Sequence, residues 1–300
     1  MEEKVTNTNK DRLFCFIFGN ENNKKWTLSL YNAVNGTNYD NPDDVEITTM
    51  KDVIYMGMKN DVSFILSSEI SLYEHQSTYN PNMPVRQLMY LARQYDKYIK
   101  HTDQNIYGSS KMKLPVPRLV VFYNGQDDKD DRILKLSDLF MNGVDPSRSD
   151  VEVTVHMYNI RPMYNSELLK DCKILAEYSW FVEEVRKNCK TMDTALAVDK
   201  AISDMPEDFE IKKFLMEHRA EVKNMSITEY DEAKTIELFQ KEARAEGREE
   251  GLAQGRALEI KEKITDMLRR GKTVEEIVDF CGYPYDQVKE IEESVKISSH

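Results

Sequence analysis

The sequence predicts an α/β domain with a mixed sheet flanked by helices, followed by helical segments and a charged C-terminal helical tail. Short strand-like runs rich in Val, Ile, Phe and Tyr occur between residues 52 and 158. A helical pattern separates two of these runs, and from about residue 165 the patterns are helical only. Because a crossover helix returns the chain to a parallel strand, we expect a mixed sheet with helices packed on its faces.

The first predicted elements are one helix and three strands. Segment 22–34 repeats apolar residues at helical spacing and ends at Asn35-Gly36, a helix stop signal. The apolar run 52–56 (DVIYM) predicts a strand. Residues 61–66 (DVSFIL) and 70–76 (ISLYEHQ) lie on either side of a short polar turn, which predicts a hairpin.

The next predicted elements are a crossover helix and two strands. A proline-rich joint at 80–84 (NPNMP) introduces a helix at about 85–100. The fully apolar run 119–123 (LVVFY) precedes Asn124-Gly125, which predicts a buried strand that ends in a turn. Segment 151–158 (VEVTVHMY) alternates in the manner of an edge strand.

Two domains are predicted: residues 1–225, whose α/β core reaches about residue 165, and the tail at 226–300. Gly247, Gly251 and Gly255 recur every fourth residue of the tail helix, and each costs about 1 kcal/mol relative to alanine. This stripe favours either close helix packing in a homodimer or a pliable joint. The two short helices near Gly282 have acidic sequences, which favour a small protein-contact module over a DNA-reading helix-turn-helix.

Composition limits the class of protein. The net charge of -12 is unfavourable for binding nucleic acid unless basic residues gather on one surface. No run of about 18 apolar residues and no signal-peptide pattern is present, so no membrane partner is expected. The cysteines lack paired spacing, which indicates a reducing cytoplasm rather than a disulfide framework or a zinc ribbon.

Acidic and amide side chains gather on the predicted hairpin. Strand alternation places Glu74 and Gln76 on one face and His75 on the other, where a packed or surface role is expected. Asp61 opens the preceding strand, and an even loop such as Ser68-Glu69 places it opposite Gln76. Two carboxylates that converge at a strand end can hold Mg²⁺, which lowers the pKa of a bound water and neutralises phosphodiester charge.

A family resemblance makes this pattern more specific. Residues 60–64 (NDVSF), 73–84 (YEHQSTYNPNMP) and 122–125 (FYNG) resemble the transposase-like branch of the PD-(D/E)XK nucleases, which is related to the Rpn recombination-promoting nucleases. The resemblance covers about residues 12–165. It implies a restriction-endonuclease-like fold and metal-dependent DNA hydrolysis. It also places Asp61 on the strand acid, Glu74 on the acid of E-x-K and Gln76 on the lysine position.

The chain departs from the superfamily pattern at two positions. No proline precedes Asp61. Gln76 replaces a lysine, and an amide can only hydrogen-bond where an ammonium would stabilise charge on the phosphate. Superfamily enzymes often add an acid on the first helix, for which Glu21 is the candidate. Its alternative role is that of a carboxylate favoured near a helix N-terminus.

The helix after Pro84 carries a basic stripe in an otherwise acidic chain. Leu88, Ala92, Tyr95 and Ile99 are expected to form its apolar face, with Tyr90 near the basic one. The residues expected to contact the DNA backbone are Arg86, Arg93, Lys97 and Lys100, with Lys111 and Lys113 in the following loop. Because no base-reading motif is present, we expect little sequence preference.

These observations favour a cytoplasmic, Mg²⁺- or Mn²⁺-dependent DNA endonuclease linked to recombination or mobile elements. Asp61 and Glu74 are expected to bind the metal, and Gln76 to position water or phosphate. The alternative is a catalytically weak or inactive protein of the same fold that binds DNA or another protein. Glutamine at the lysine position and the acidic composition favour that alternative.

Overall fold

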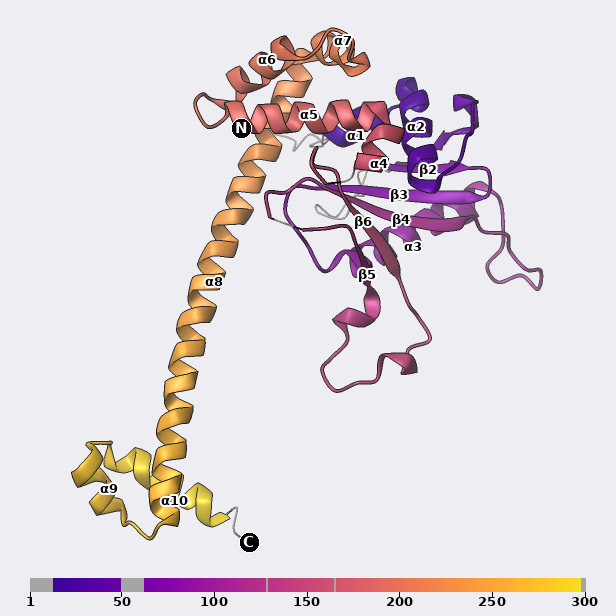
Figure 1. Ribbon diagram of the computed structural model, residues 1–300. Coiled ribbons are helices and arrows are strands. Elements are labelled where there is room, and N and C mark those ends of the chain that lie inside the picture. Colours follow the sequence, from indigo (N-terminus) through magenta and orange to yellow (C-terminus); the bar gives the residue numbers. More distant parts are fainter. Residues whose placement is uncertain (1–12, 50–61, 128, 165, 298–300) are drawn as a thin grey trace, which may run out of the picture. The chain divides into compact units, whose positions relative to one another are not determined.

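Six strands form one mixed sheet in the order β1-β2-β3-β4-β6-β5, as seen in Figure 1. The structure is a computed structural model that describes residues 13–49, 62–127, 129–164 and 166–297. The chain divides into two compact units, residues 1–234 and 235–300. The strands are β1 (Glu46–Ile47), β2 (Val62–Leu66), β3 (Glu69–Gln76), β4 (Val116–Tyr123), β5 (Arg132–Lys135) and β6 (Thr154–Asn159).

The pairing of the strands confirms the predicted α/β class with a mixed sheet. Strands β1, β2 and β3 are antiparallel neighbours, and β3, β4 and β6 are parallel neighbours. Strand β5 pairs antiparallel with β6. Helix α3 (Met83–His101) connects β3 to the parallel β4, as expected for a crossover.

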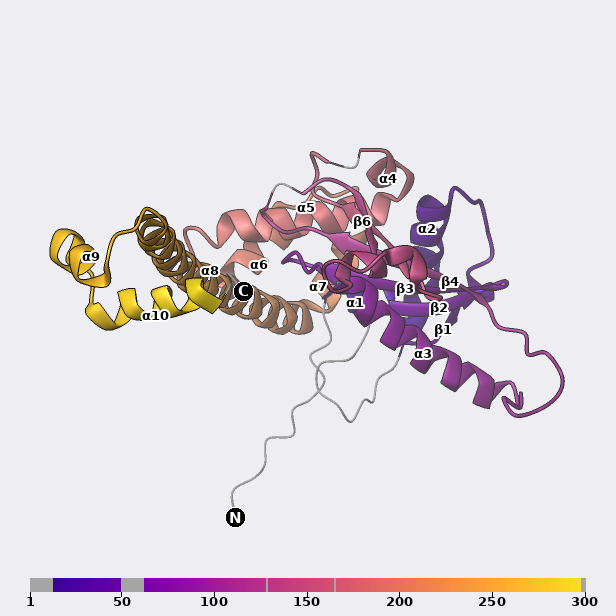
Figure 2. The ribbon, with the colours of Figure 1, turned by 90° about the horizontal axis from the view of Figure 1, so that it is seen from below.

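Helices cover both faces of the sheet. Helix α3 covers one face, as Figures 1 and 2 show. The other face is covered by α1 (Leu13–Phe18), α2 (Lys24–Asn35), α4 (Ser166–Asp171) and α5 (Lys173–Asn188). The helices that complete this unit after the sheet confirm the helical character predicted from residue 165. Helix α5 is followed by α6 (Thr194–Asp204) and α7 (Glu210–Glu217).

Three predicted elements agree closely with the structure. Helix α2 ends at Gly36, whose φ of 62° is the left-handed conformation that a helix C-cap favours. Strands β2 and β3 form the predicted hairpin, and α3 begins with Pro84 in its first turn. These signals are local, because a cap, a turn and a two-residue period depend only on neighbouring residues.

The sheet differs from the sequence prediction at its two edges. Strand β6 is not an edge strand, because the four-residue β5 pairs along its outer side. Strands β1 and β5 were not predicted, since each is too short to show an alternating pattern. The strand predicted at residues 52–56 lies outside the described residues.

Helix α8 (Arg219–Arg269) begins before Ser226, the residue at which the tail was expected to start, and the division between the two compact units falls within this helix. In the second unit, α9 (Val274–Cys281) and α10 (Tyr285–Ile297) form the two short helices predicted around Gly282. Ile264, Ile277 and Val288 are buried in a small core of their own. Within the described residues, no helix combines the length and apolarity needed to cross a membrane.

We predict that replacing both Gly251 and Gly255 by alanine stabilises α8. Apart from the backbone of α8 itself, a methyl group at either position would meet no atom of the described residues within 4 Å. Each substitution should therefore raise the free energy of unfolding by about 1 kcal/mol, because alanine favours the helix. Thermal unfolding followed by circular dichroism at two protein concentrations measures the effect. A lower stability of the variant at the higher concentration would instead indicate that these glycines lie against a second helix in a homodimer.

Candidate active site between strand β3 and helix α3

Glu74 and Gln76 lie on the face of β3 that α3 covers. Their neighbours on this face, Ile70 and Leu72, pack with residues of α3 and β4. Only 1% of Glu74 and 6% of Gln76 is exposed. The predicted common face of Glu74 and Gln76 therefore lies in a buried layer between the sheet and a helix rather than at an open strand edge.

The buried carboxylate of Glu74 forms an ion pair with Arg86 of α3. The Nη2 group of Arg86 donates to Oε1 of Glu74. The same guanidinium donates to the Tyr90 hydroxyl from Nη2 at 2.9 Å and from Nε at 3.2 Å. Arg86 and Tyr90 are one helical turn apart, which aligns them on one side of α3. Because 30% of the Arg86 side chain is exposed, the pair is only partly buried, and breaking it costs less than the roughly 3–5 kcal/mol of a fully buried pair.

The inner face of α3 is more polar than predicted. Its buried residues are Met83, Pro84, Gln87, Tyr90 and Gln94. Ala92, which was expected to face the sheet, is exposed, and Leu88, Tyr95 and Ile99 are only partly buried. The helix is rotated in this way because the sheet beneath it is also polar: Nε2 of Gln94 donates to Oγ of Ser63 at 2.7 Å.

Two glutamines in this layer carry polar atoms that lack partners. Nε2 of Gln76 donates to Sδ of Met83 at 2.6 Å. Within the part of the chain that the structure describes, Oε1 of Gln76 and both amide atoms of Gln87 are buried without a hydrogen-bond partner. A buried polar atom without a partner costs about 1–3 kcal/mol, and such atoms are typical of sites that take up water or a ligand.

The donor set suits a hard cation in part. A carboxylate and an amide oxygen on one face, from Glu74 and Gln76, are ligand types that Mg²⁺ accepts. Among the described residues, no group of three or more His, Cys, Asp and Glu side chains could hold a metal ion. The fit therefore depends on Asp61, which lies outside the described residues, so the shared face of Asp61 and Glu74 stays a prediction.

The register of the hairpin differs from the expected one by two residues. The loop is even, as expected, but it consists of Ser67-Ser68, and Leu66 pairs with Glu69. Val62 is consequently opposite Tyr73. A loop at Ser68-Glu69, which would have aligned Asp61 with Gln76, would have placed Val62 opposite His75. A shift of the register by two residues leaves every side chain on the same face of the sheet. Ser63 and Leu72, which are paired, therefore share the face that α3 covers.

The predicted basic residues do not form one uniform exposed stripe. Arg86 is directed to Glu74, and Nζ of Lys97 donates to the Thr48 carbonyl at 3.2 Å. Lys100 pairs with Asp96 at 2.7 Å in an exposed ion pair, which contributes little to stability. Arg93 is half-buried, whereas Lys111 and Lys113 are exposed in the loop after α3.

Glu21 belongs to the helical layer on the other face of the sheet. It lies in a short 3₁₀ helix (Glu21–Asn23) immediately before α2. Its carboxylate pairs with Nζ of Lys24 at 3.0 Å, and 60% of its side chain is exposed. The contacts of Glu21 thus match the alternative role of a charge near a helix start.

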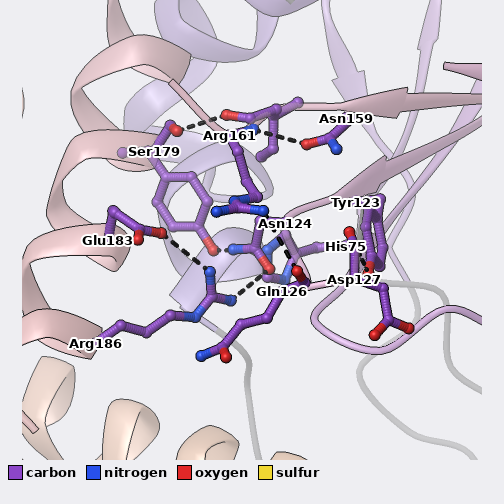
Figure 3. A network of polar contacts seen from close by, with 12 residues as sticks. His75, Tyr123, Asn124, Gln126, Asp127, Asn159, Arg161, Ser179, Glu183 and Arg186 are labelled. Atoms are coloured by element: carbon purple, nitrogen blue, oxygen red, sulfur yellow. Dashed lines mark hydrogen bonds and ion pairs between the residues drawn. The ribbon is translucent and has the colours of Figure 1, made fainter. Parts of the chain in front are cut away.

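His75 is packed, as expected, on the opposite face from Glu74. Its Nε2 lies 3.2 Å from the Tyr178 hydroxyl of α5, and its ring stacks on Phe14 with centroids 5.4 Å apart. Figure 3 shows His75 among polar side chains at the ends of the parallel strands. The residue anchors α5 to the sheet.

A polar network at the end of β4 was not predicted from the sequence (Figure 3). Nη2 of Arg186 donates to Oδ1 of Asn124 at 3.1 Å, while its Nη1 lies 3.4 Å from Glu183. Burial raises the pKa of the neighbouring Tyr123 to about 12, and the charge of Asp127 contributes. The Asn124-Gly125 pair predicted the turn, but no local sequence pattern predicts that Asn124 contacts an arginine on α5.

The chain matches no protein-family model, no curated protein and no solved structure. Its membership of the PD-(D/E)XK superfamily therefore stays a prediction from the residues that carry the resemblance. The contacts of Glu74, Gln76 and Arg86 are the structural basis for a functional assignment.

Proposed function

We propose that this protein is a Mg²⁺-dependent DNA endonuclease with a restriction-endonuclease-like fold, acting in recombination or mobile-element biology. The observation that carries the proposal is the buried polar layer around Glu74, in which the side chains of Gln76 and Gln87 hold polar atoms without partners among the described residues. A purely structural layer would favour apolar residues, since leaving buried polar atoms unsatisfied is costly.

The topology supports the same fold. An antiparallel hairpin of β2 and β3 is followed by the crossover helix α3 and the parallel strand β4. Helices cover both faces of this unit. The described residues that resemble the nuclease pattern lie on β2, on β3 and the turn that leads into α3, and at the end of β4.

Each residue of the site has a role in phosphodiester hydrolysis. Asp61 and Glu74 would hold the metal ion, which would lower the pKa of a bound water and neutralise phosphate charge. Oε1 of Gln76 accepts a hydrogen bond from the attacking water and thereby orients it. The DNA backbone is held by basic side chains with little sequence preference, namely Arg93, Lys97, Lys100, Lys111 and Lys113.

A second candidate function is a DNA-binding or regulatory module of the same fold without useful catalysis. The ion pair between Arg86 and Glu74 favours it, because a guanidinium already neutralises the carboxylate that would bind the metal. The glutamine at position 76 also favours it. This candidate predicts a folded protein whose binding to DNA weakens with salt and which does not cut DNA.

Incubation of the purified protein with supercoiled plasmid tests the two candidates. We expect nicked and linear DNA with Mg²⁺ or Mn²⁺, no cleavage with EDTA, and loss of cleavage in Asp61→Ala and Glu74→Ala. Cleavage that survives both substitutions would place the site elsewhere. Absence of cleavage by the folded wild-type protein, with salt-sensitive binding retained, would support the second candidate.

A further inference from the structure

In the proposed site, Gln76 occupies the strand position at which a lysine would balance the negative charge. Hydrolysis forms a bond between the water oxygen and phosphorus and breaks the bond to the leaving sugar oxygen, which takes up one water proton. Negative charge increases on the phosphate oxygens as this happens, next to the carboxylate of Glu74. Because the Gln76 amide is neutral, it cannot balance that charge as a cation would.

Helix α3 brings a cation to this place. The guanidinium of Arg86 contacts Glu74 directly, and 30% of the Arg86 side chain is exposed, so an incoming phosphate can reach it. Two other basic residues of α3 contact different groups: Lys97 donates to the Thr48 carbonyl, and Lys100 pairs with Asp96. Arginine is suited to this role because its planar fork of donors can bind a carboxylate and a phosphate together.

Tyr90 fixes the position of that cation. Both Nε and Nη2 of Arg86 donate to its hydroxyl, and the guanidinium carbon lies 5.7 Å from the centre of the tyrosine ring. Only 1% of Tyr90 is exposed, so the packed ring cannot change position easily. A flexible arginine is thereby held beside Glu74 before any substrate arrives, which lowers the entropy lost on binding.

We infer that Arg86 is a catalytic residue that stabilises the charge on the scissile phosphate in place of a strand lysine, and that Tyr90 is the positioning residue that holds it. The inference rests on the proposed nuclease function. It moves Arg86 from the general DNA-binding surface into the active site, and it gives the ion pair with Glu74 a role in catalysis.

Cleavage kinetics of Arg86→Gln test the role of the charge. We expect kcat to fall by about 100- to 1,000-fold, as for the loss of one charge-stabilising donor, with a change in KM below about threefold. The double variant Arg86→Gln/Gln76→Lys should recover at least about tenfold in kcat, because it returns the cation to the strand. Arg219→Gln is the matched control, since Arg219 also pairs with a carboxylate, Asp199, at 2.6 Å.

Thermal unfolding shows whether Arg86→Gln is folded. If it is not, two further variants test the inference. Arg86→Lys retains the charge but not the fork of donors, and its kcat should fall about tenfold. Tyr90→Phe retains the ring and should lower kcat about tenfold with KM unchanged. Wild-type kcat in folded Arg86→Lys and Tyr90→Phe would overturn the inference. If the wild-type protein cuts no DNA, the proposed function fails and this inference fails with it.

Discussion

Glu74→Gln should reduce metal-dependent DNA cleavage by at least about 100-fold. The substitution keeps the size and the hydrogen-bonding shape of the side chain but removes its negative charge. A divalent cation gains several kcal/mol from a carboxylate ligand in a buried site, and each 1.4 kcal/mol corresponds to about a tenfold change in rate. Because Glu74 is 1% exposed, bulk water has little access to the site and cannot compensate for the loss of the carboxylate charge.

Glu177→Gln is the matched control for that experiment. Glu177 of α5 is also 1% exposed, and its Oε2 accepts from the Ile211 backbone at 2.9 Å. It is on the layer that covers the other face of the sheet, so its substitution should lower the melting temperature without changing the cleavage rate of the folded protein. Metal binding measured by calorimetry should weaken in Glu74→Gln but not in Glu177→Gln. Equal cleavage rates in the two variants would remove Glu74 from the active site.

Gly125→Ala should destabilise the sheet unit by about 1–3 kcal/mol or more, as expected for overpacking of a buried position. An added Cβ would lie 2.3 Å from the Tyr123 hydroxyl and 2.5 Å from the Ser77 carbonyl oxygen. Neither group can move freely, because Tyr123 is buried in the sheet and Ser77 directly follows Gln76 in the chain. The glycine after Asn124 is therefore required by close packing and not by its backbone angles.

Chemical denaturation of Gly125→Ala measures this loss of stability. Gly251→Ala is the control, because it is the same substitution at an open position. Cleavage should fall as well, since a displaced Ser77 shifts the end of β3 that carries Gln76. Addition of the same methyl group at Gly251 should stabilise the protein, because no described residue outside the local backbone of α8 lies within 4 Å. A midpoint of unfolding for Gly125→Ala equal to that of the wild type would show that the turn can adjust without strain.

Sequence patterns predicted the elements whose signals are local. The end of α2 at Gly36, the hairpin of β2 and β3, and the crossover by α3 all follow from caps, turns and periods that involve neighbouring residues. The same short-range alternation predicted that His75 and Glu74 lie on opposite faces. Strands as short as β1 and β5 escaped prediction, because two to four residues cannot display a period.

By itself, the sequence determined the mixed α/β class and the shared face of Glu74 and Gln76, because the direction of strand side chains depends only on position along the chain. The tertiary structure alone decided what those side chains meet. It rotated α3 so that Gln87, Tyr90 and Gln94 face the sheet, and it joined Arg86 to Glu74. It also joined Arg186 to Asn124. Such pairs depend on how packed elements rotate and approach one another, and this is set by the sum of many contacts over the whole interface.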